Sequence, residues 1–322
     1  MREDLLREVE RDLQAQQARN EEITLRRNRE AREKFPEIAE LSEERRKLIT
    51  SSMEGILRGE AAPDNLPGKM EEVSDKIRKA LRARGLPEDW LSPVYTCPVC
   101  RDSGFVGETV RERCSCVRER YQRKLRAAIG LPEDGHETFE RFDPGVFPET
   151  RQPGAAMSQR QAMTEIRDLC REWAETYPHQ AYRDLILSGK SGLGKTFLLH
   201  AIANRLIERD AQVLLISAYT FLEIARKSYF ENDGRMQELL ETEVLMLDDL
   251  GSEPMMQNIT IEQLFCLVNE RQRRNRPTVI STNLNREELK ERYTERIVSR
   301  LTDRRNCIFL PLEGRDIRNG KE

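Results

Sequence analysis

The pattern G-x-x-x-x-G-K-[ST] is matched at each fixed position by Gly189-Lys190-Ser191-Gly192-Leu193-Gly194-Lys195-Thr196. An apolar stretch, residues 185–187, precedes this segment, and a helical run, residues 197–207, follows it. Glycines let successive backbone N–H groups turn toward phosphates, and the positive end of the helix dipole favours the same negative charge. We therefore expect ATP binding, with Lys195 at the β- and γ-phosphates and Thr196 holding magnesium.

Two carboxylates follow a second apolar run. Residues 244–247 read as a buried parallel strand that ends in Asp248 and Asp249. We expect Asp248 to anchor magnesium through water and Asp249 to polarise the attacking water. A third apolar run, residues 278–282, ends at Asn283, whose amide suits a water between Asp249 and the γ-phosphate. Capping of the next helix is the alternative role for Asn283.

Four of the seven cysteines form two close pairs, Cys97 with Cys100 and Cys114 with Cys116. This spacing lets two knuckles converge on one tetrahedral ion, and four thiolates predict a structural zinc site with no open position for water. Unligated cysteines and an iron–sulfur cluster are the alternatives, and His136 is a remote substitute ligand. The remaining cysteines, Cys170, Cys266 and Cys307, lie in apolar contexts and are predicted to be buried.

Charge and composition narrow the function classes. The chain has 322 residues, 34% of them charged, and a net charge of −3, which excludes a globally basic nucleic-acid binder. No apolar run approaches the ~18 residues that a membrane span needs. The sequence begins with acidic residues rather than a basic and then apolar signal. We expect a soluble protein of the cytoplasm.

Three regions are predicted. Residues 1–90 are densely charged with helically spaced apolar residues, which indicates amphipathic helices that act either as a solvated spacer or as a partner-binding module. Residues 91–130 form the zinc-binding module, including a basic helix over residues 117–128. Residues 131–322 alternate strands and helices, which predicts an α/β domain with a parallel sheet between helices.

The α/β region resembles the DnaC/DnaI helicase loaders, which are AAA+ ATPases. The resemblance covers roughly residues 139 to 318 and rests on the phosphate loop and on four further segments: residues 248–253, 281–284, 295–301 and 314–318. The upstream cysteine pairs look like the zinc module of the DnaI-type members. Because the sequence ends soon after this core, we expect no helical lid of the kind that many AAA+ proteins carry; the loaders lack that lid too.

The resemblance implies roles for residues that their types alone do not assign. It makes Asn283 the sensor 1 residue and Arg300 an arginine finger that reaches the ATP of a neighbouring subunit, with Arg296 as the second choice. Self-association through the AAA+ domain is therefore expected. Without a lid, Arg318 is a doubtful sensor 2 residue.

The expected function is an ATP-dependent loader that binds a DnaB-type replicative helicase, through residues 1–90, and delivers it onto single-stranded DNA. Residues 226–230 carry basic and aromatic side chains suited to single-stranded DNA, although their neighbourhood also fits the packed face of a helix. The alternative function is an IstB-like ATPase that helps a transposase on duplex DNA. The zinc module favours the loader, because such transposition helpers generally lack it.

Overall fold

The computed structural model describes residues 2–58, 65–107, 110–131, 135–151, 154, 156–231, 234–257 and 259–318, without the side chains of residues 2, 3, 56 and 229–231. The chain forms two compact units, Met1–Tyr121 and Gln122–Glu322. Each unit has its own core, and each is described by itself below.

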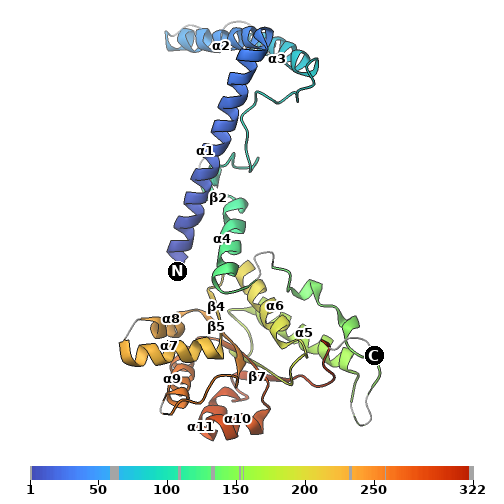
Figure 1. The fold of residues 1–322 in the computed structure, drawn as a ribbon, viewed down its shortest axis with the longest axis vertical. Helices are drawn as coiled ribbons and strands as arrows, with labels where there is room; N and C mark the ends of the chain where they lie inside the picture. Colours follow the sequence, from blue (N-terminus) through green and yellow to red (C-terminus); the bar gives the residue numbers. More distant parts are fainter. Residues whose placement is uncertain are drawn as a thin grey trace. The chain divides into compact units, whose positions relative to one another are not determined.

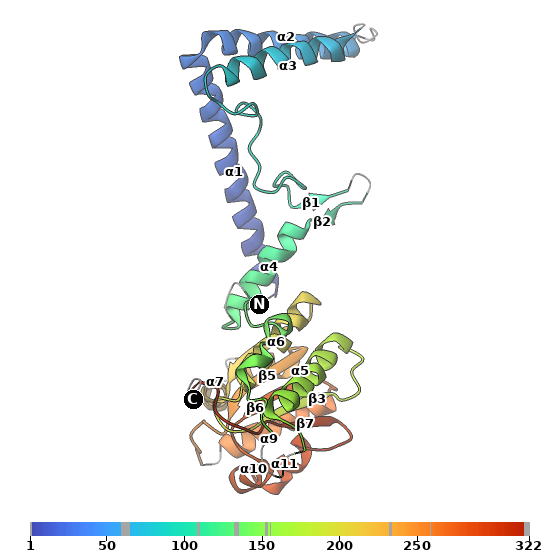
Figure 2. The ribbon, with the colours of Figure 1, turned by 90° about the vertical axis from the view of Figure 1, so that its right-hand side faces the viewer.

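The first unit begins with three helices, α1 (Arg2–Lys34), α2 (Pro36–Leu57) and α3 (Leu66–Arg82). Phe35 separates the first two, and Pro36 begins α2 at the position where a helix tolerates proline. Helices α2 and α3 run side by side (Figures 1 and 2) and bury Ile38, Ile77 and Leu81 between them. The amphipathic pattern of this region is therefore used, at least in part, for packing within the chain.

The segment with the four clustered cysteines, here called the cysteine module (residues 97–116 and the helix that extends from them), comes after these helices. It contains a two-residue hairpin, in which β1 (Phe105–Val106) pairs antiparallel with β2 (Glu112–Arg113), and the helix α4 (Ser115–Ala128). Helix α4 crosses the boundary between the two units.

The second unit opens with two short 3₁₀ turns, η1 (Phe139–Arg141) and η2 (Pro144–Val146), and then the helix α5 (Gln159–Thr176). Ser158 and Gln161 form a reciprocal capping box that fixes the start of α5. The remaining helices are α6 (Lys195–Glu208), α7 (Ala218–Glu231), α8 (Arg235–Glu241), α9 (Thr260–Arg273), α10 (Arg286–Tyr293) and α11 (Glu295–Leu301).

A parallel sheet of five strands forms the centre of this unit. The strands are β3 (Asp184–Ser188), β4 (Val213–Ser217), β5 (Val244–Leu250), β6 (Thr278–Thr282) and β7 (Cys307–Pro311). Their order in the sheet is β4-β5-β6-β3-β7, and every pairing is parallel. Helices α5 and α6 lie on one side and α7–α9 on the other (Figure 1), which explains why the middle residues of the strands are mostly apolar. The predicted α/β architecture is confirmed.

Two of the three isolated cysteines are buried as predicted, Cys170 and Cys307, but Cys266 is exposed. Helix α9 buries Leu264, Leu267 and Val268, and the period of the helix places Cys266 on its opposite side. None of the described helices combines the length and the apolar character that crossing a bilayer requires.

Candidate functional site

The phosphate-loop sequence forms the turn between β3 and α6. Gly194 is the N-cap of α6 with φ +87°, and Gly192 has φ +76°, values that favour glycine. A Cβ atom on Gly192 would also lie 1.7 Å from Oδ1 of Asp316. The loop therefore needs glycine at both positions, and it presents the N-terminus of a long helix, where anions bind.

Lys195 is folded into the loop. Its Nζ donates hydrogen bonds to the carbonyl oxygens of Gly189, at 2.6 Å, and Lys190, at 2.9 Å, and to Oδ1 of Asn283, at 2.7 Å. Burial lowers the pKa of the Lys195 ammonium, while the carboxylates of Asp249 and Asp248 oppose that change. The buried cation has three acceptors that a phosphate oxygen can replace.

The two acids of β5 lie beside this lysine. Thr196 Oγ1 is 3.5 Å from Oδ2 of Asp248, and Ser281 Oγ donates to the other oxygen of Asp248. The same Ser281 oxygen accepts the backbone N–H of Asp249 at 2.9 Å. A hydroxyl on β6 therefore fixes both the Asp248 carboxylate and the Asp249 backbone.

Asp249 has an unusual backbone. Its φ is +55°, and the pairing of β5 with β6 shifts register between Leu247 and Leu250, on either side of the two acids. Such irregularities re-aim side chains at functional edges of sheets. Burial raises the pKa of the Asp249 carboxyl, and Asp248 raises it further, against the opposing charges of Lys195 and Arg318.

Asn283 is the first residue after β6, and its amide lies against Lys195. The helix-capping alternative is wrong, because Asn285 caps α10: its side chain accepts the N–H of Glu288 at 2.9 Å in a capping box. The strand order explains the position of Asn283, since β6 lies between β3 and β5. The phosphate loop, the two acids and Asn283 thus meet at one edge of the sheet.

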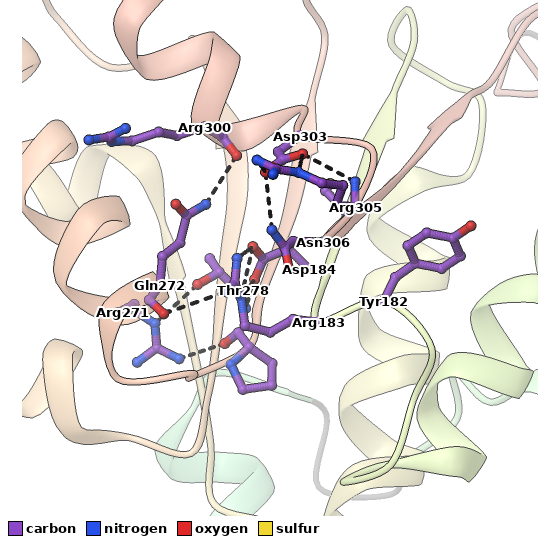
Figure 3. A network of polar contacts seen from close by, with 12 residues as sticks. Tyr182, Arg183, Asp184, Arg271, Gln272, Thr278, Arg300, Asp303, Arg305 and Asn306 are labelled. Atoms are coloured by element: carbon purple, nitrogen blue, oxygen red, sulfur yellow. Dashed lines mark hydrogen bonds and ion pairs between the residues drawn. The ribbon is translucent and has the colours of Figure 1, made fainter.

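Arg296 and Arg300 share one aromatic neighbour. Their guanidinium carbons lie 4.1 Å and 5.0 Å from the centre of the Phe265 ring on α9. The carbonyl oxygen of Arg300 accepts a hydrogen bond from Gln272 Nε2 at 3.0 Å, while its guanidinium points away from that network (Figure 3). The backbone of Arg300 is therefore anchored, and its side chain rests on a ring.

The buried cation beneath this network is Arg271. Its guanidinium donates to the carbonyl oxygens of Leu239, at 2.7 Å, and Thr242, at 3.0 Å, and to Thr278 Oγ1, at 3.1 Å. Burial lowers the pKa of Arg271 to about 9. These bonds join α8, α9 and the start of β6, so Arg271 stabilises the scaffold behind the site rather than the site itself.

The segment 226–230 lies in α7. The neighbouring apolar residues of this helix form a packed face, as the alternative interpretation expected: Phe221, Leu222, Ile224 and Ala225. Arg226 forms an ion pair with Glu223 at 3.1 Å, and Lys227 is exposed. The side chains of Tyr229 and Phe230, the aromatic part of the predicted DNA contact, are outside the described residues.

The four cysteines converge. All their Sγ atoms lie within 4.8 Å of one another, with 3.9 Å between Cys97 and Cys114 and 3.5 Å between Cys100 and Cys116. A tetrahedron of thiolates at the zinc–sulfur distance of about 2.3 Å has edges of about 3.8 Å, so the cluster fits zinc. A backbone N–H from Cys100 lowers the pKa of the Cys97 thiol to about 7, and burial raises the pKa of Cys116.

Sequence reasoning assigned no role to the aromatic residues ahead of α5. Phe142 and Phe147 stack with ring centres 5.7 Å apart, Phe142 lies 6.0 Å from Phe197, and the Phe147 ring is 3.8 Å from where a Cβ of Gly194 would lie. The signal was present as three phenylalanines within residues 139–147. Phe142, Phe147 and Phe197 form an apolar cluster beside the phosphate loop.

Comparison with known proteins identifies relatives of this unit. A family model described as the bacterial DnaA ATPase domain matches residues 158–306. The replicative helicase loader DnaI of Bacillus subtilis (strain 168) is 35% identical over 116 residues, which is 35% of this chain and 37% of DnaI. The loader DnaC of Escherichia coli (strain K12) is 34% identical over 123 residues, 36% of this chain and 49% of DnaC. The chain thus spans less than half the length of both named loaders.

One relative is matched over most of its length. YdaV of Escherichia coli (strain K12) is 30% identical over 197 residues, which cover 60% of this chain and 74% of YdaV. Among solved structures, a crystal structure of DnaI superposes with a TM-score of 0.41 at 23% identity, over 58% of this chain and 94% of that one. Together with the phosphate loop and the acids of β5, the sequence matches to DnaI, DnaC and YdaV show that the chain belongs to the DnaC/DnaI-type family of AAA+ ATPases.

Proposed function

We propose that this chain is an ATP-dependent loader that binds a DnaB-type replicative helicase in the cytoplasm and delivers it onto single-stranded DNA. The observation that carries the proposal is the meeting of Lys195, Asp248 and Asn283 at one sheet edge, in a chain whose named relatives are helicase loaders. A nucleotide site of this kind gives the loader a two-state switch.

The residues of the site divide the work of ATP hydrolysis. With ATP bound, Lys195 would exchange its carbonyl and amide acceptors for phosphate oxygens, and Thr196 and Asp248 are the residues that would hold magnesium. Asp249, whose carboxyl has a raised pKa because it is buried beside Asp248, accepts a hydrogen bond from the attacking water. Asn283 orients that water from β6. ATP with magnesium supplies the phosphoryl group and the charge that these side chains recognise.

Arg300 completes the site of a neighbouring subunit in this proposal, with Arg296 as the second candidate. Among the described hydrogen bonds and ion pairs, none joins the Arg300 side chain to the phosphate loop of its own chain. A finger that acts in trans stabilises charge that develops only in the transition state. Hydrolysis then depends on self-association. We expect the helicase and DNA to stimulate hydrolysis because they assemble the subunits.

Three other parts of the chain are proposed to bind the helicase, zinc and single-stranded DNA. We propose that residues 1–90 hold the helicase, that the four cysteines carry a structural zinc ion, and that residues 226–230 contact single-stranded DNA. The geometry of the sulfur atoms supports the zinc proposal. The exposed Lys227 and its neighbour Arg226 offer the cations for phosphates.

The test is helicase loading on a defined substrate. The purified chain and the DnaB-type helicase of its own organism are mixed with ATP and circular single-stranded DNA, and DNA-bound helicase is counted after gel filtration. We expect loading that depends on ATP and that Lys195→Ala removes. The proposal is overturned if the chain retains no helicase in any nucleotide state, or instead stimulates a transposase from a neighbouring gene on duplex DNA, as an IstB-like helper does.

A further inference from the structure

One face of α1 lies along the cysteine module in the first unit. Val9 and Leu13 are buried and belong to the same apolar cluster as Cys100 and Cys114. Farther along the same face of α1, the contacts are hydrogen bonds rather than apolar packing. Thr24 Oγ1 accepts the backbone N–H of Val94 at 3.1 Å. One side of the thiol cluster is thus covered by residues of α1 that lie more than eighty positions earlier in the sequence.

The centre of this contact is Asp102, which is only 2% exposed. Its Oδ1 accepts the backbone N–H of Cys97 at 2.7 Å. Its Oδ2 accepts the backbone N–H of Thr96 at 2.9 Å and Nδ2 of Asn20 on α1 at 2.7 Å. One carboxylate therefore fixes the backbone of the first cysteine and, at the same time, a side chain of α1.

Two further bonds make the connection specific. Asn20 Nδ2 also donates to Thr96 Oγ1 at 3.0 Å, and Gln17 Nε2 donates to the carbonyl oxygen of Asp102 at 2.8 Å. Asp102 has φ +62°, a left-handed conformation that aspartate and asparagine tolerate better than most residues. A buried carboxylate needs such partners, because burying a charge without them is costly.

We propose that Asp102 and Asn20 are positioning residues of the metal site, so that zinc binding and the docking of α1 are a single coupled equilibrium. The proposal rests on zinc binding by the four cysteines. Asp102 orders the Cys97 backbone that carries one thiolate, and Asn20 holds Asp102 in place. By linkage, zinc orders α1 to the same degree that docked α1 tightens zinc.

Zinc affinity tests the first half. The full-length protein is titrated against a chromophoric zinc chelator as wild type, Asn20→Leu and Asp102→Asn. Groups that orient metal ligands contribute about tenfold to a hundredfold in affinity, and we expect losses in this range for both variants. Asn28→Leu is the matched control, since among the described hydrogen bonds the Asn28 side chain donates only to the Thr24 carbonyl oxygen of its own helix, at 2.8 Å. The zinc affinity of this variant should stay within about twofold of wild type.

Hydrogen exchange of the wild-type chain tests the second half without any substitution. Chelation of zinc should raise amide exchange over residues 9–24 of α1, while residues 73–81 of α3, which pack on α2, should keep their protection. Equal zinc affinity in wild type, Asn20→Leu and Asp102→Asn would overturn the proposal. The same conclusion would follow if the amide exchange of α1 were the same with and without zinc. A wild-type chain that binds no zinc would overturn both this coupling and its premise.

Discussion

Replacing Phe265 by leucine separates nucleotide binding from turnover. The ring of Phe265 supports the guanidinium groups of both Arg296 and Arg300, at 4.1 Å and 5.0 Å. Leucine keeps an apolar side chain against the neighbouring core but removes the aromatic face. If Arg300 is the finger that acts in trans, its guanidinium then loses the surface that aligns it.

The size of the effect follows from the environment of Arg300. A cation on an aromatic ring gains about 0.5–1 kcal/mol at an exposed site and about 2 kcal/mol when desolvated. Arg300 is half-buried and its Nε is enclosed, so the loss should be about 1–2 kcal/mol. Because about 1.4 kcal/mol changes a rate tenfold, hydrolysis should fall about fivefold to thirtyfold.

The assay compares two numbers for each variant: the dissociation constant of labelled ATP and the hydrolysis rate with single-stranded DNA and helicase. Phe265→Leu should leave the dissociation constant of ATP unchanged and lower the hydrolysis rate. Phe309→Leu is the matched control, because the Phe309 ring lies under a different arginine, Arg286, at 4.4 Å. The reasoning fails if both leucine variants turn over alike while Arg300→Ala is inactive. If Arg296→Ala and Arg300→Ala are both fully active, the proposed finger itself is wrong.

Four further outcomes follow from the site. Lys195→Ala should abolish binding of labelled ATP yet leave the circular dichroism spectrum intact, since only a side chain inside the loop is lost. Asp249→Asn should keep magnesium-dependent ATP binding through Asp248 and lose most turnover, so normal turnover would remove Asp249 from its role. Mixtures of Arg300→Ala and Lys195→Ala should exceed the summed rates of the separate proteins, because one interface then combines an intact loop with an intact finger. Arg271→Met should lower the free energy of unfolding in urea by about 2–3 kcal/mol, since its hydrogen bonds are charged and buried; an unchanged midpoint would contradict this.

The phosphate loop was predictable because its information is local. Gly192, Gly194 and Lys195 work within one turn, and the turn needs those residue types in that order. The role of Ser281 was not predictable in the same way. Its bonds to Asp248 and Asp249 depend on a register shift between two strands that pair only in the folded sheet.

In the cysteine cluster, too, the local features were predictable from the sequence and the long-range contacts were not. The four thiols were visible as two close pairs, since ligands of small metal modules are local in sequence. Asn20 gave no signal, because it is one polar residue in a charged helix and its partner Asp102 lies 82 positions away. The prediction that Cys266 is buried was wrong because it relied on the apolar residues next to Cys266 in the sequence. Successive residues of a helix point about 100° apart, so adjacent residues face different surroundings.

The position of β6 connects the parts of the proposed cycle. β6 lies between β3, which leads into the phosphate loop, and β5, which carries both acids. Its end therefore meets both sides of the site: Ser281 bonds Asp248, and Asn283 accepts from Lys195. From there the chain passes through the capping box of α10 directly into α11 and Arg300. In the proposed cycle, a rearrangement of Lys195 around a γ-phosphate would therefore have a short covalent route to Arg300, the arginine that we propose acts on the ATP of the next subunit.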